Sequence, residues 1–220
     1  MLLVVFGPRT RLAAAVLAGA AGRAHRTLLV AREEAEQAWC HTTYPGLATL
    51  EGWREDVVEA LADEDLGIAI CAAGPIHPGA SDFAHDSAGV LRDVGVVARL
   101  VRGCRRAHIV FVSSALALWP RRQREYYSGF KGVALDAIAS TVAGSPQHAF
   151  SVFFPGRLVG ERSAWRPSSM LHTSYATLAE RIIGALESSV PRRSLVGADA
   201  RLYACARALN ALGVAVLGRA

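Results

Sequence analysis

The sequence predicts an α/β fold in which a parallel sheet of about seven strands carries helices on both faces. Short apolar runs rich in β-branched residues alternate with segments of helical periodicity from one end of the chain to the other. The first apolar run turns at Gly7 directly into a helical segment, and 220 residues suit one domain with a full core. No repeat, linker or low-complexity segment divides the chain, so we expect one Rossmann-like, doubly wound domain over residues 1–220.

The expected strands are continuous apolar runs, the pattern of strands buried on both faces of a parallel sheet. They lie at Leu2–Phe6, Thr27–Ala31, His41–Tyr44, Leu66–Cys71, His108–Ser114, His148–Phe154 and Arg193–Val196. The region between Cys40 and Leu50 is ambiguous, and the short third strand is our interpretation of it. The expected helices cover Arg11–Ala21, a segment that starts at Arg32-Glu33-Glu34, Glu51–Leu61, Asp86–Arg106, Glu125–Val142, Thr173–Glu187 and Asp199–Leu212.

Composition excludes several classes of protein. Hydrophobic residues make up 52% of the chain, but no stretch of 18 residues is apolar without a charge, so we expect no spanning helix. The apolar N-terminal run is too short for a signal peptide, and we expect a cytoplasmic protein. The net charge of +5 comes from arginines that are dispersed among acidic residues and lack interleaved aromatics. We therefore expect no nucleic-acid partner, because an anionic small molecule suffices to explain a mildly basic cleft.

The four cysteines are Cys40, Cys71, Cys104 and Cys205, and they lie far apart in the sequence. No C-x-x-C pair and no histidine cluster accompanies them. We expect buried, reduced thiols, with neither a disulfide framework nor a bound metal.

The only lysine of the chain, Lys131, follows Tyr127 by four residues within an expected helix. Residues at this spacing lie one turn apart on the same face. An ammonium there favours the phenolate, and the phenol becomes a usable proton donor or acceptor near neutral pH. Ser114 lies thirteen residues before Tyr127, at the carboxyl end of an expected strand, where open α/β sheets bind ligands.

Ser114, Tyr127 and Lys131 resemble the catalytic trio of the short-chain dehydrogenase/reductase family in residue type and spacing. The resemblance extends from Met1 to the helix after Ala198 and depends on the order of motifs. It implies an oxidoreductase in which Ser114 hydrogen-bonds the substrate carbonyl, Tyr127 donates the proton, and Lys131 lowers the pKa of that tyrosine and holds the nicotinamide ribose. The adjacent Tyr126 lacks this spacing, so we assign the role to Tyr127.

The turn Gly7-Pro8-Arg9-Thr10-Arg11-Leu12-Ala13 stands where the family binds the pyrophosphate, but only the first of its usual glycines remains. Ala13 is small enough for close packing, and Arg9 or Arg11 could add charge-assisted bonds to phosphate. An ordinary turn in a fold that has lost its nucleotide stays an alternative. Arg32 follows the second strand and favours NADP(H) over NAD(H), because an arginine suits a 2′-phosphate.

Two further segments resemble parts of the family's cofactor site. Cys71-Ala72-Ala73-Gly74 stands in place of an Asn-Asn-Ala-Gly segment, and Pro155-Gly156-Arg157-Leu158 resembles the turn that pins the nicotinamide carboxamide. The sole asparagine of the chain is Asn210, so the family's helical asparagine is absent and Asp93 stands near its place. The implied cofactor-binding residues are Gly7, Arg9, Thr10, Arg11, Leu12, Arg32, Ala72, Ala73, Gly74, Tyr127, Lys131, Pro155, Gly156 and Leu158.

Aromatic, histidine and methionine side chains in three loops are candidate walls of the substrate pocket, with a small substrate lid around residues 157–175. They are His77, Trp119, Trp165, Met170, His172 and Tyr175. Such a mixture favours a cyclic or partly aromatic substrate.

The leading hypothesis is an NADPH-dependent ketoreductase or alcohol dehydrogenase. The alternatives are an isomerase, dehydratase or cyclase that uses Tyr127 as acid or base, and a non-catalytic nucleotide-binding protein. Small residues at Gly129, Gly132, Ala134 and Ala137 further favour a homo-oligomer.

Overall fold

The computed structural model describes residues 1–23, 25–31, 33–51, 61, 63–73, 83–118, 125–160, 171–188 and 190–217. Its strands are β1 (Leu2–Phe6), β2 (Arg26–Ala31), β3 (Ala48–Glu51), β4 (Asp65–Ile70), β5 (Arg106–Val112), β6 (Ala149–Pro155), β7 (Leu158–Val159), β8 (Thr173–Ser174) and β9 (Arg193–Val196). Its helices are α1 (Arg11–Ala21), α2 (Glu34–Thr43), α4 (Phe83–Gly103), α5 (Ala115–Leu118), α6 (Glu125–Ser140), α8 (Tyr175–Ser188) and α9 (Ala198–Leu217).

Seven strands form one sheet in the order β3-β2-β1-β4-β5-β6-β9, and every pair in it is parallel. The doubly wound parallel sheet predicted from the sequence is therefore confirmed. The strand order reverses at β1, which has β2 on one side and β4 on the other. In open sheets of this kind, ligands bind outside the carboxyl ends of the strands at such a reversal.

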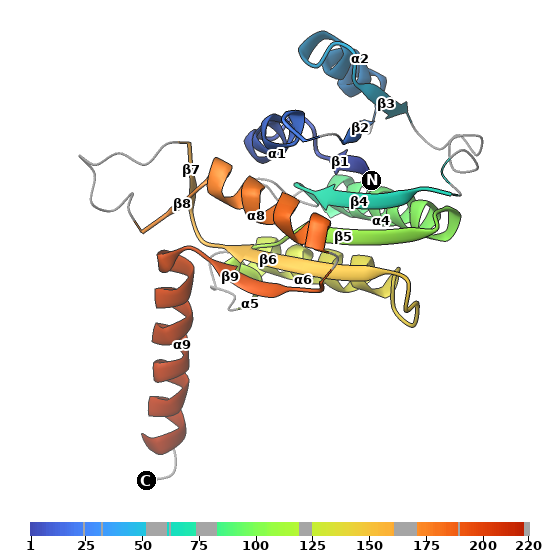
Figure 1. Cartoon of the computed structure of the whole chain (residues 1–220). Helices are drawn as coiled ribbons and strands as arrows, with labels where there is room; N and C mark the ends of the chain where they lie inside the picture. The colour runs from blue at the N-terminus through green and yellow to red at the C-terminus, as the bar shows by residue number, and fades with distance from the viewer. Residues whose placement is uncertain are drawn as a thin grey trace.

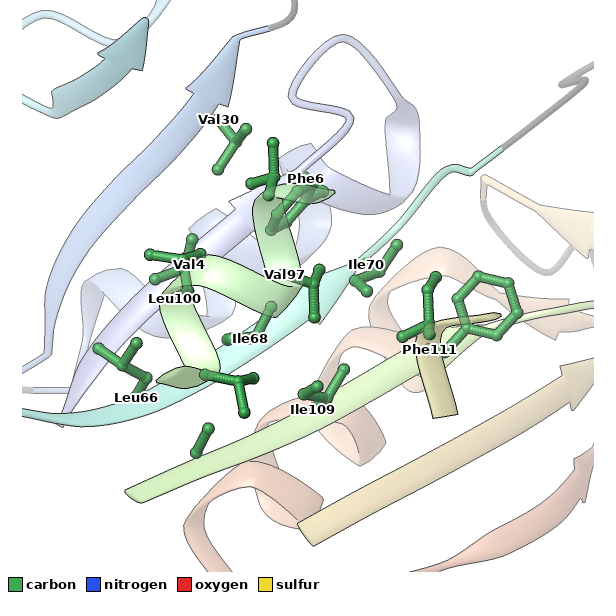
Figure 2. Close-up of a cluster of buried hydrophobic side chains, with 14 of the residues drawn as sticks. Val4, Phe6, Val30, Leu66, Ile68, Ile70, Val97, Leu100, Ile109 and Phe111 are labelled. Atoms are coloured by element: carbon green, nitrogen blue, oxygen red, sulfur yellow. The ribbon is translucent and has the colours of Figure 1, made fainter. Parts of the chain in front are cut away.

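The sheet has a hydrophobic layer on each face, so its central strands are buried on both faces. Alternate residues of β1 enter opposite layers, Val4 and Phe6 on one face and Leu3 and Val5 on the other. Helices α4 and α6 cover the first face, and α1 and α8 cover the second. Figure 2 shows Val97 and Leu100 of α4 over β1 and β4.

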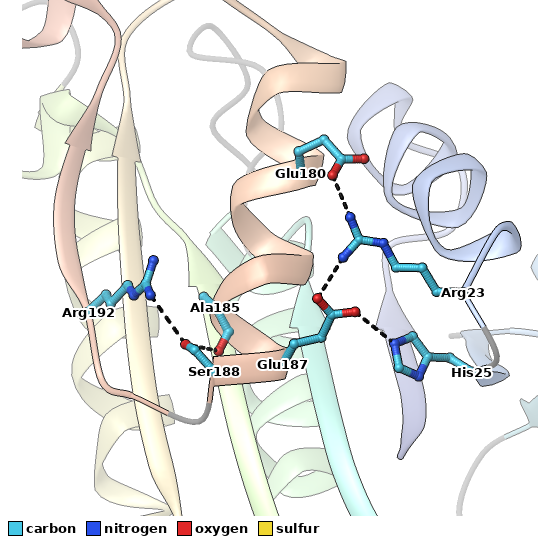
Figure 3. Close-up of polar contacts among 7 residues, drawn as sticks. All are labelled: Arg23, His25, Glu180, Ala185, Glu187, Ser188 and Arg192. Atoms are coloured by element: carbon cyan, nitrogen blue, oxygen red, sulfur yellow. Dashed lines mark hydrogen bonds and ion pairs between the residues drawn. The ribbon is translucent and has the colours of Figure 1, made fainter.

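A polar cluster at the surface joins the segment between α1 and β2 to α8 (Figure 3). The Arg23 guanidinium donates to Glu180 at 2.6 Å and to Glu187 at 2.7 Å, and the His25 ring lies 3.1 Å from Glu187. Partly exposed pairs of this kind each contribute about 1 kcal/mol or less. The two helices also approach closely at Gly19, where an added Cβ would lie 2.9 Å from Ile183 Cδ1. Together these contacts fix α1, and with it the turn that precedes it.

The prediction of a third strand at His41–Tyr44 is wrong, because α2 extends through Thr43 and the strand is β3. The helix buries Glu36 and Cys40, which lie one turn apart and face the body of the protein. Strand β3 has four residues and pairs only with β2 at the edge of the sheet. The helix expected over Glu51–Leu61 lies largely outside the described residues, which omit 52–60.

The last helix, α9, begins against the sheet and then extends away from it (Figure 1). Residues 205–210 are exposed, and Leu209 is 69% exposed. The expectation that all four cysteines are buried is therefore wrong for Cys205, which lies on this helix. The thiols of Cys40, Cys71 and Cys104 are buried and free.

No helix among the described residues is both long and apolar enough to cross a membrane. No group of three or more His, Cys, Asp or Glu side chains in the same part of the chain could hold a metal ion.

Candidate active site

A cleft of 610 Å³ lies at the carboxyl ends of β1, β4, β5 and β6. It extends from the turn after β1 to the segments that follow β5 and β6, where the sheet topology predicts a ligand site. Its walls are formed by Arg9, Thr10, Arg11, Leu12, Cys71, Ala72, Val112, Ser113, Ser114, Tyr127, Lys131, Pro155, Gly156, Leu158 and Tyr175. Most of the sequence-predicted site residues thus meet in one cavity.

The turn after β1 is shaped to admit an anionic group. Gly7 has φ +70°, and a Cβ there would lie 2.9 Å from the Cβ of Ala72, so the close approach of these backbones requires glycine. Thr10 is the N-cap of α1, since its hydroxyl accepts from the Ala13 N–H at 3.1 Å and donates to the Gly7 carbonyl at 2.9 Å. The N-terminus of α1, with the residues that open it, lines the cleft and favours negative charge.

The predicted trio lies on the wall of this cleft. Ser114 follows β5, and its hydroxyl accepts from the Leu116 N–H at 3.3 Å at the start of α5. Tyr127 and Lys131 lie one turn apart in the first half of α6. Lys131 is only 5% exposed, and its ammonium donates to the Ala73 carbonyl at 2.7 Å. The same nitrogen lies 5.7 Å from the centroid of the Tyr127 ring, so phenol and ammonium are neighbours as expected.

Tyr126 occupies a different position from Tyr127. Its hydroxyl donates to Asp86 of α4 at 2.8 Å, and its ring lies 4.9 Å from that of Phe130. Tyr127 instead lines the 610 Å³ cleft and the cavity next to it. The structure thus gives the two adjacent tyrosines separate roles, and only Tyr127 faces a cavity that holds the other members of the trio.

A second cavity, of 630 Å³, adjoins the cleft and shares Ser114, Tyr127, Pro155 and Gly156 with it. Its remaining walls are formed by Ala115, Leu116, Arg157, Asp199, Ala200 and Tyr203. The first two turns of α9 thus form one side of this cavity. That wall could not be predicted from the sequence, because no local pattern relates α9 to the loops after β5 and β6.

A third cavity, of 250 Å³, lies on the other side of the Gly7 turn. It is bounded by that turn, by Ala72 and by residues of α2 and α4. Arg9 lines both this cavity and the cleft, and its guanidinium lies 5.7 Å from the centroid of the Trp39 ring. Glu33, the N-cap residue of α2, also lines the small cavity. Two arginines, Arg9 and Arg92, and two glutamates, Glu33 and Glu36, therefore line the cavity where the cofactor's ribose was expected.

Several predicted site residues lie outside the described part of the chain: Arg32, Gly74, His77, Trp119, Trp165 and Met170, with most of the expected lid at 161–170. Tyr175 lines the cleft. His172 lines none of these three cavities, and its ring instead lies 3.0 Å from the Asp199 carboxylate. Ala73 is fully buried and takes part through its carbonyl, which binds Lys131.

Three residues that line the cleft, Cys71, Val112 and Ser113, are not among the site residues predicted from the sequence. Ser113 is 5% exposed, and within the described chain its hydroxyl has no hydrogen-bond partner. A buried hydroxyl without a partner is costly, so a polar ligand atom in the cleft would satisfy it. The Cys71 thiol also lines the cleft, and burial raises its pKa to about 12. Cys71 therefore stays protonated at neutral pH and offers no nucleophile.

No protein-family model and no curated protein matches the sequence. Solved structures do match. The chain is similar to a short-chain dehydrogenase from Burkholderia cenocepacia in complex with NADP, with a TM-score of 0.70 at 18% identity over 97% of this chain and 94% of that one. It is also similar to the yeast methylglyoxal/isovaleraldehyde reductase complexed with NADPH, with a TM-score of 0.65 at 12% identity over 90% and 78% of the two chains.

A third similar structure is the UDP-N-acetylglucosamine 4-epimerase from Bacillus cereus, with a TM-score of 0.61 at 14% identity over 90% of this chain and 78% of that one. Identities this low establish a shared fold and nothing finer. The chain has the fold of the short-chain dehydrogenases/reductases, as the sequence predicted.

Proposed function

We propose that the protein is an NADPH-dependent reductase of a carbonyl compound, or the reverse alcohol dehydrogenase. The single observation that supports this most is the meeting of a hydroxyl, a phenol and a buried ammonium, from Ser114, Tyr127 and Lys131, on the wall of one cleft. The bound nicotinamide would supply a hydride. Ser114 would hydrogen-bond the substrate oxygen, and Tyr127 would donate a proton to it. Lys131 would favour the phenolate that forms, because its charge lies beside the ring.

The residues around the Gly7 turn fit a dinucleotide. Gly7 allows the two backbones to approach, the N-terminus of α1 attracts the pyrophosphate, and the exposed Arg9 could reach a phosphate from either of two cavities. Arg9 supports NADP(H), whereas the Glu33 carboxylate in the same small cavity would favour the free ribose of NAD(H). We propose NADP(H), because the exposed guanidinium matches a 2′-phosphate.

The 630 Å³ cavity is the proposed substrate site, since Tyr127 and Ser114 line it and the nucleotide cleft alike. A small metabolite with a cyclic or partly aromatic group would find Tyr203 there, as well as Leu116.

An isomerase, dehydratase or cyclase with the same tyrosine as acid or base is the second candidate. The reduced glycine turn, with Gly7 alone, and the absent helical asparagine favour it. Asp93, which stands near the place of that asparagine, is only 1% exposed. Net consumption of NADPH when substrate is added would decide against this candidate.

The matched pair Tyr127→Phe and Tyr126→Phe tests the proposal. NADPH and NADH are first titrated against the wild type by nicotinamide fluorescence, and a panel of ketones and aldehydes is then screened for NADPH consumption. We expect Tyr127→Phe to lower kcat/KM by about 10²–10⁴-fold, because the proton donor is lost, with NADPH affinity unchanged. We expect Tyr126→Phe to keep its activity and to lose about 1 kcal/mol of stability with its bond to Asp86. Full turnover by Tyr127→Phe, or failure of the wild type to bind either nucleotide, would refute the proposal.

We propose a homo-oligomer that associates through the exposed faces of α4 and α6. Leu91 is 71% exposed and Val133 is 61% exposed on these two helices. The small-residue face predicted from the sequence needs one correction, because Ala134 is fully buried in the core and not available to a partner. Gly129 is exposed and Gly132 half-buried, so a second helix could still approach closely.

A further inference from the structure

The carboxylate of Asp199, in the first turn of α9, holds together three segments that are distant in sequence. Its Oδ2 accepts from the backbone N–H of Arg157 at 2.7 Å and lies 3.0 Å from Nδ1 of His172. Its Oδ1 accepts from the Ala200 N–H at 2.9 Å. The backbone N–H of Asp199 also donates to the Leu171 carbonyl. The side chain of Asp199 is 19% exposed, so the carboxylate is largely removed from water.

Two glycines leave the space that this carboxylate fills. A Cβ added at Gly156 would lie 2.4 Å from Cγ and from both carboxylate oxygens of Asp199. A Cβ at Gly197 would lie 2.6 Å from Oδ1, and Gly197 has φ +103°. Real Cβ atoms do not come this close to other heavy atoms, so both positions require glycine while the carboxylate stays in place. The space for the Asp199 side chain is therefore left by one glycine that is distant in sequence, Gly156, and by one two residues earlier, Gly197.

Asp199 acts on the backbone at the junction of the two main cavities. Gly156 lines both the 610 Å³ cleft and the 630 Å³ cavity, as Ser114 and Tyr127 do. In a reduction, the hydride and the proton reach the same carbonyl group, so the nicotinamide end of the cofactor must lie at this junction. The Gly156–Arg157 peptide, whose N–H binds Asp199, belongs to the segment that borders that end.

We propose that Asp199 is a positioning residue, which fixes the Gly156–Arg157 backbone where the nicotinamide and the substrate meet, with His172 bracing its carboxylate. The inference rests on the proposed function, because it assigns the nicotinamide to that junction. The charged acceptor matters, since hydrogen bonds to an ionised group are about twice as strong as neutral ones. The adenosine half of the nucleotide would lie at the Gly7 turn, at the other end of the cleft, beyond the reach of these bonds.

Two variants separate the hydrogen bonds of Asp199 from its volume. Asp199→Leu keeps the branched shape and the number of side-chain heavy atoms but has no acceptor. In Asp199→Asn the amide oxygen can still accept from Arg157 and His172, while the amide nitrogen loses the bond from the Ala200 N–H. The probes are NADPH, which has a nicotinamide, and 2′,5′-ADP, which has only the adenosine half. We expect Asp199→Leu to weaken NADPH binding about tenfold and to leave 2′,5′-ADP binding within about twofold, because the loss is local. Asp199→Asn should give an NADPH affinity between those of the wild type and Asp199→Leu, because its amide oxygen accepts without the charge.

Hydrogen exchange provides a measurement that needs no nucleotide. In Asp199→Leu we expect faster exchange in the peptide that contains the Arg157 amide and unchanged exchange in α1. Equal NADPH affinity for wild type and Asp199→Leu would overturn the proposal, and so would an equal loss for both probes, which would mark a general effect on the fold. A wild type that binds neither nucleotide would overturn the proposed function instead. The exchange at Arg157 would then still decide whether Asp199 fixes this backbone, and unchanged exchange would show that it does not.

Discussion

Replacing Gly7 with alanine tests whether the turn after β1 depends on close backbone approach. Two effects oppose the substitution. The left-handed conformation, φ +70°, costs a residue with a Cβ roughly 1–2 kcal/mol. The new Cβ would also lie 2.9 Å from the Cβ of Ala72 and 3.2 Å from its backbone nitrogen, and this crowding against backbone adds about 1–3 kcal/mol. We therefore expect Gly7→Ala to lower the free energy of unfolding by about 2–5 kcal/mol.

Gly144→Ala is the matched control. Gly144 has φ +80°, nearly the same conformation as Gly7, but no atom lies within 4 Å of an added Cβ. Both substitutions reduce the entropy of the unfolded chain to a similar extent, so this effect cancels in the comparison. Urea denaturation should show a loss for Gly7→Ala that exceeds the loss for Gly144→Ala by about 1–3 kcal/mol, the part due to crowding against Ala72. Equal losses would refute the explanation by close approach.

Two further predictions concern pH and association. Burial, with the nearby charge of Arg192, lowers the pKa of His108, whose Nε2 lies 2.8 Å from the Ser151 hydroxyl. The unfolded chain therefore binds the proton more readily than the folded protein does. The contribution of His108 to the free energy of unfolding is full above pH 6.5 and is lost as the pH drops below it. His108→Gln should therefore reduce the dependence of the free energy of unfolding on pH, measured by denaturation from pH 7.5 to 5. An unchanged slope would assign the acid sensitivity to other groups. Replacing Leu91 and Val133 together with glutamate should convert the expected oligomer to a monomer in sedimentation experiments, since each would bury a charge in the interface. Association that survives this double substitution would place the interface elsewhere.

The central part of the fold could be predicted because its strands are encoded locally. The run Leu2–Phe6 is apolar throughout, and a strand buried on both faces needs only such a run. Strand β3 could not be predicted in the same way. Its four residues alternate in polarity, and it pairs with a single neighbour, so its position depends on β2 more than on its own sequence. In the same region, α2 is a helix because it buries Glu36 and Cys40 against the body of the protein, a contact that propensity does not express.

The site shows the same division between local and distant information. The spacing of Tyr127 and Lys131 is a property of one helix, so the sequence places the two residues side by side. The wall formed by α9 is different, because Asp199 meets a backbone 42 residues earlier in the chain, at Arg157. The only trace of this contact in the sequence is glycine at positions 156 and 197, and those glycines also fit ordinary turns. Their reason becomes visible only when the carboxylate that fills their space is seen.

The lysine at position 131 fits the proposed function better than it fits a role in stability. All other basic side chains, apart from histidines, are arginine, and Lys131 is buried to 95% against the Ala73 carbonyl and the Tyr127 ring. Removing an ammonium from water costs free energy that its interactions in the interior only partly offset, so a hydrophobic residue would serve the core better. A guanidinium would fit worse, because its five donors in a rigid fork need more acceptors than a compact ammonium does. A buried lysine at this place is therefore difficult to explain by packing, whereas the proposed function would explain it, since a positive charge 5.7 Å from the centroid of the Tyr127 ring would favour the ionised tyrosine that proton transfer requires.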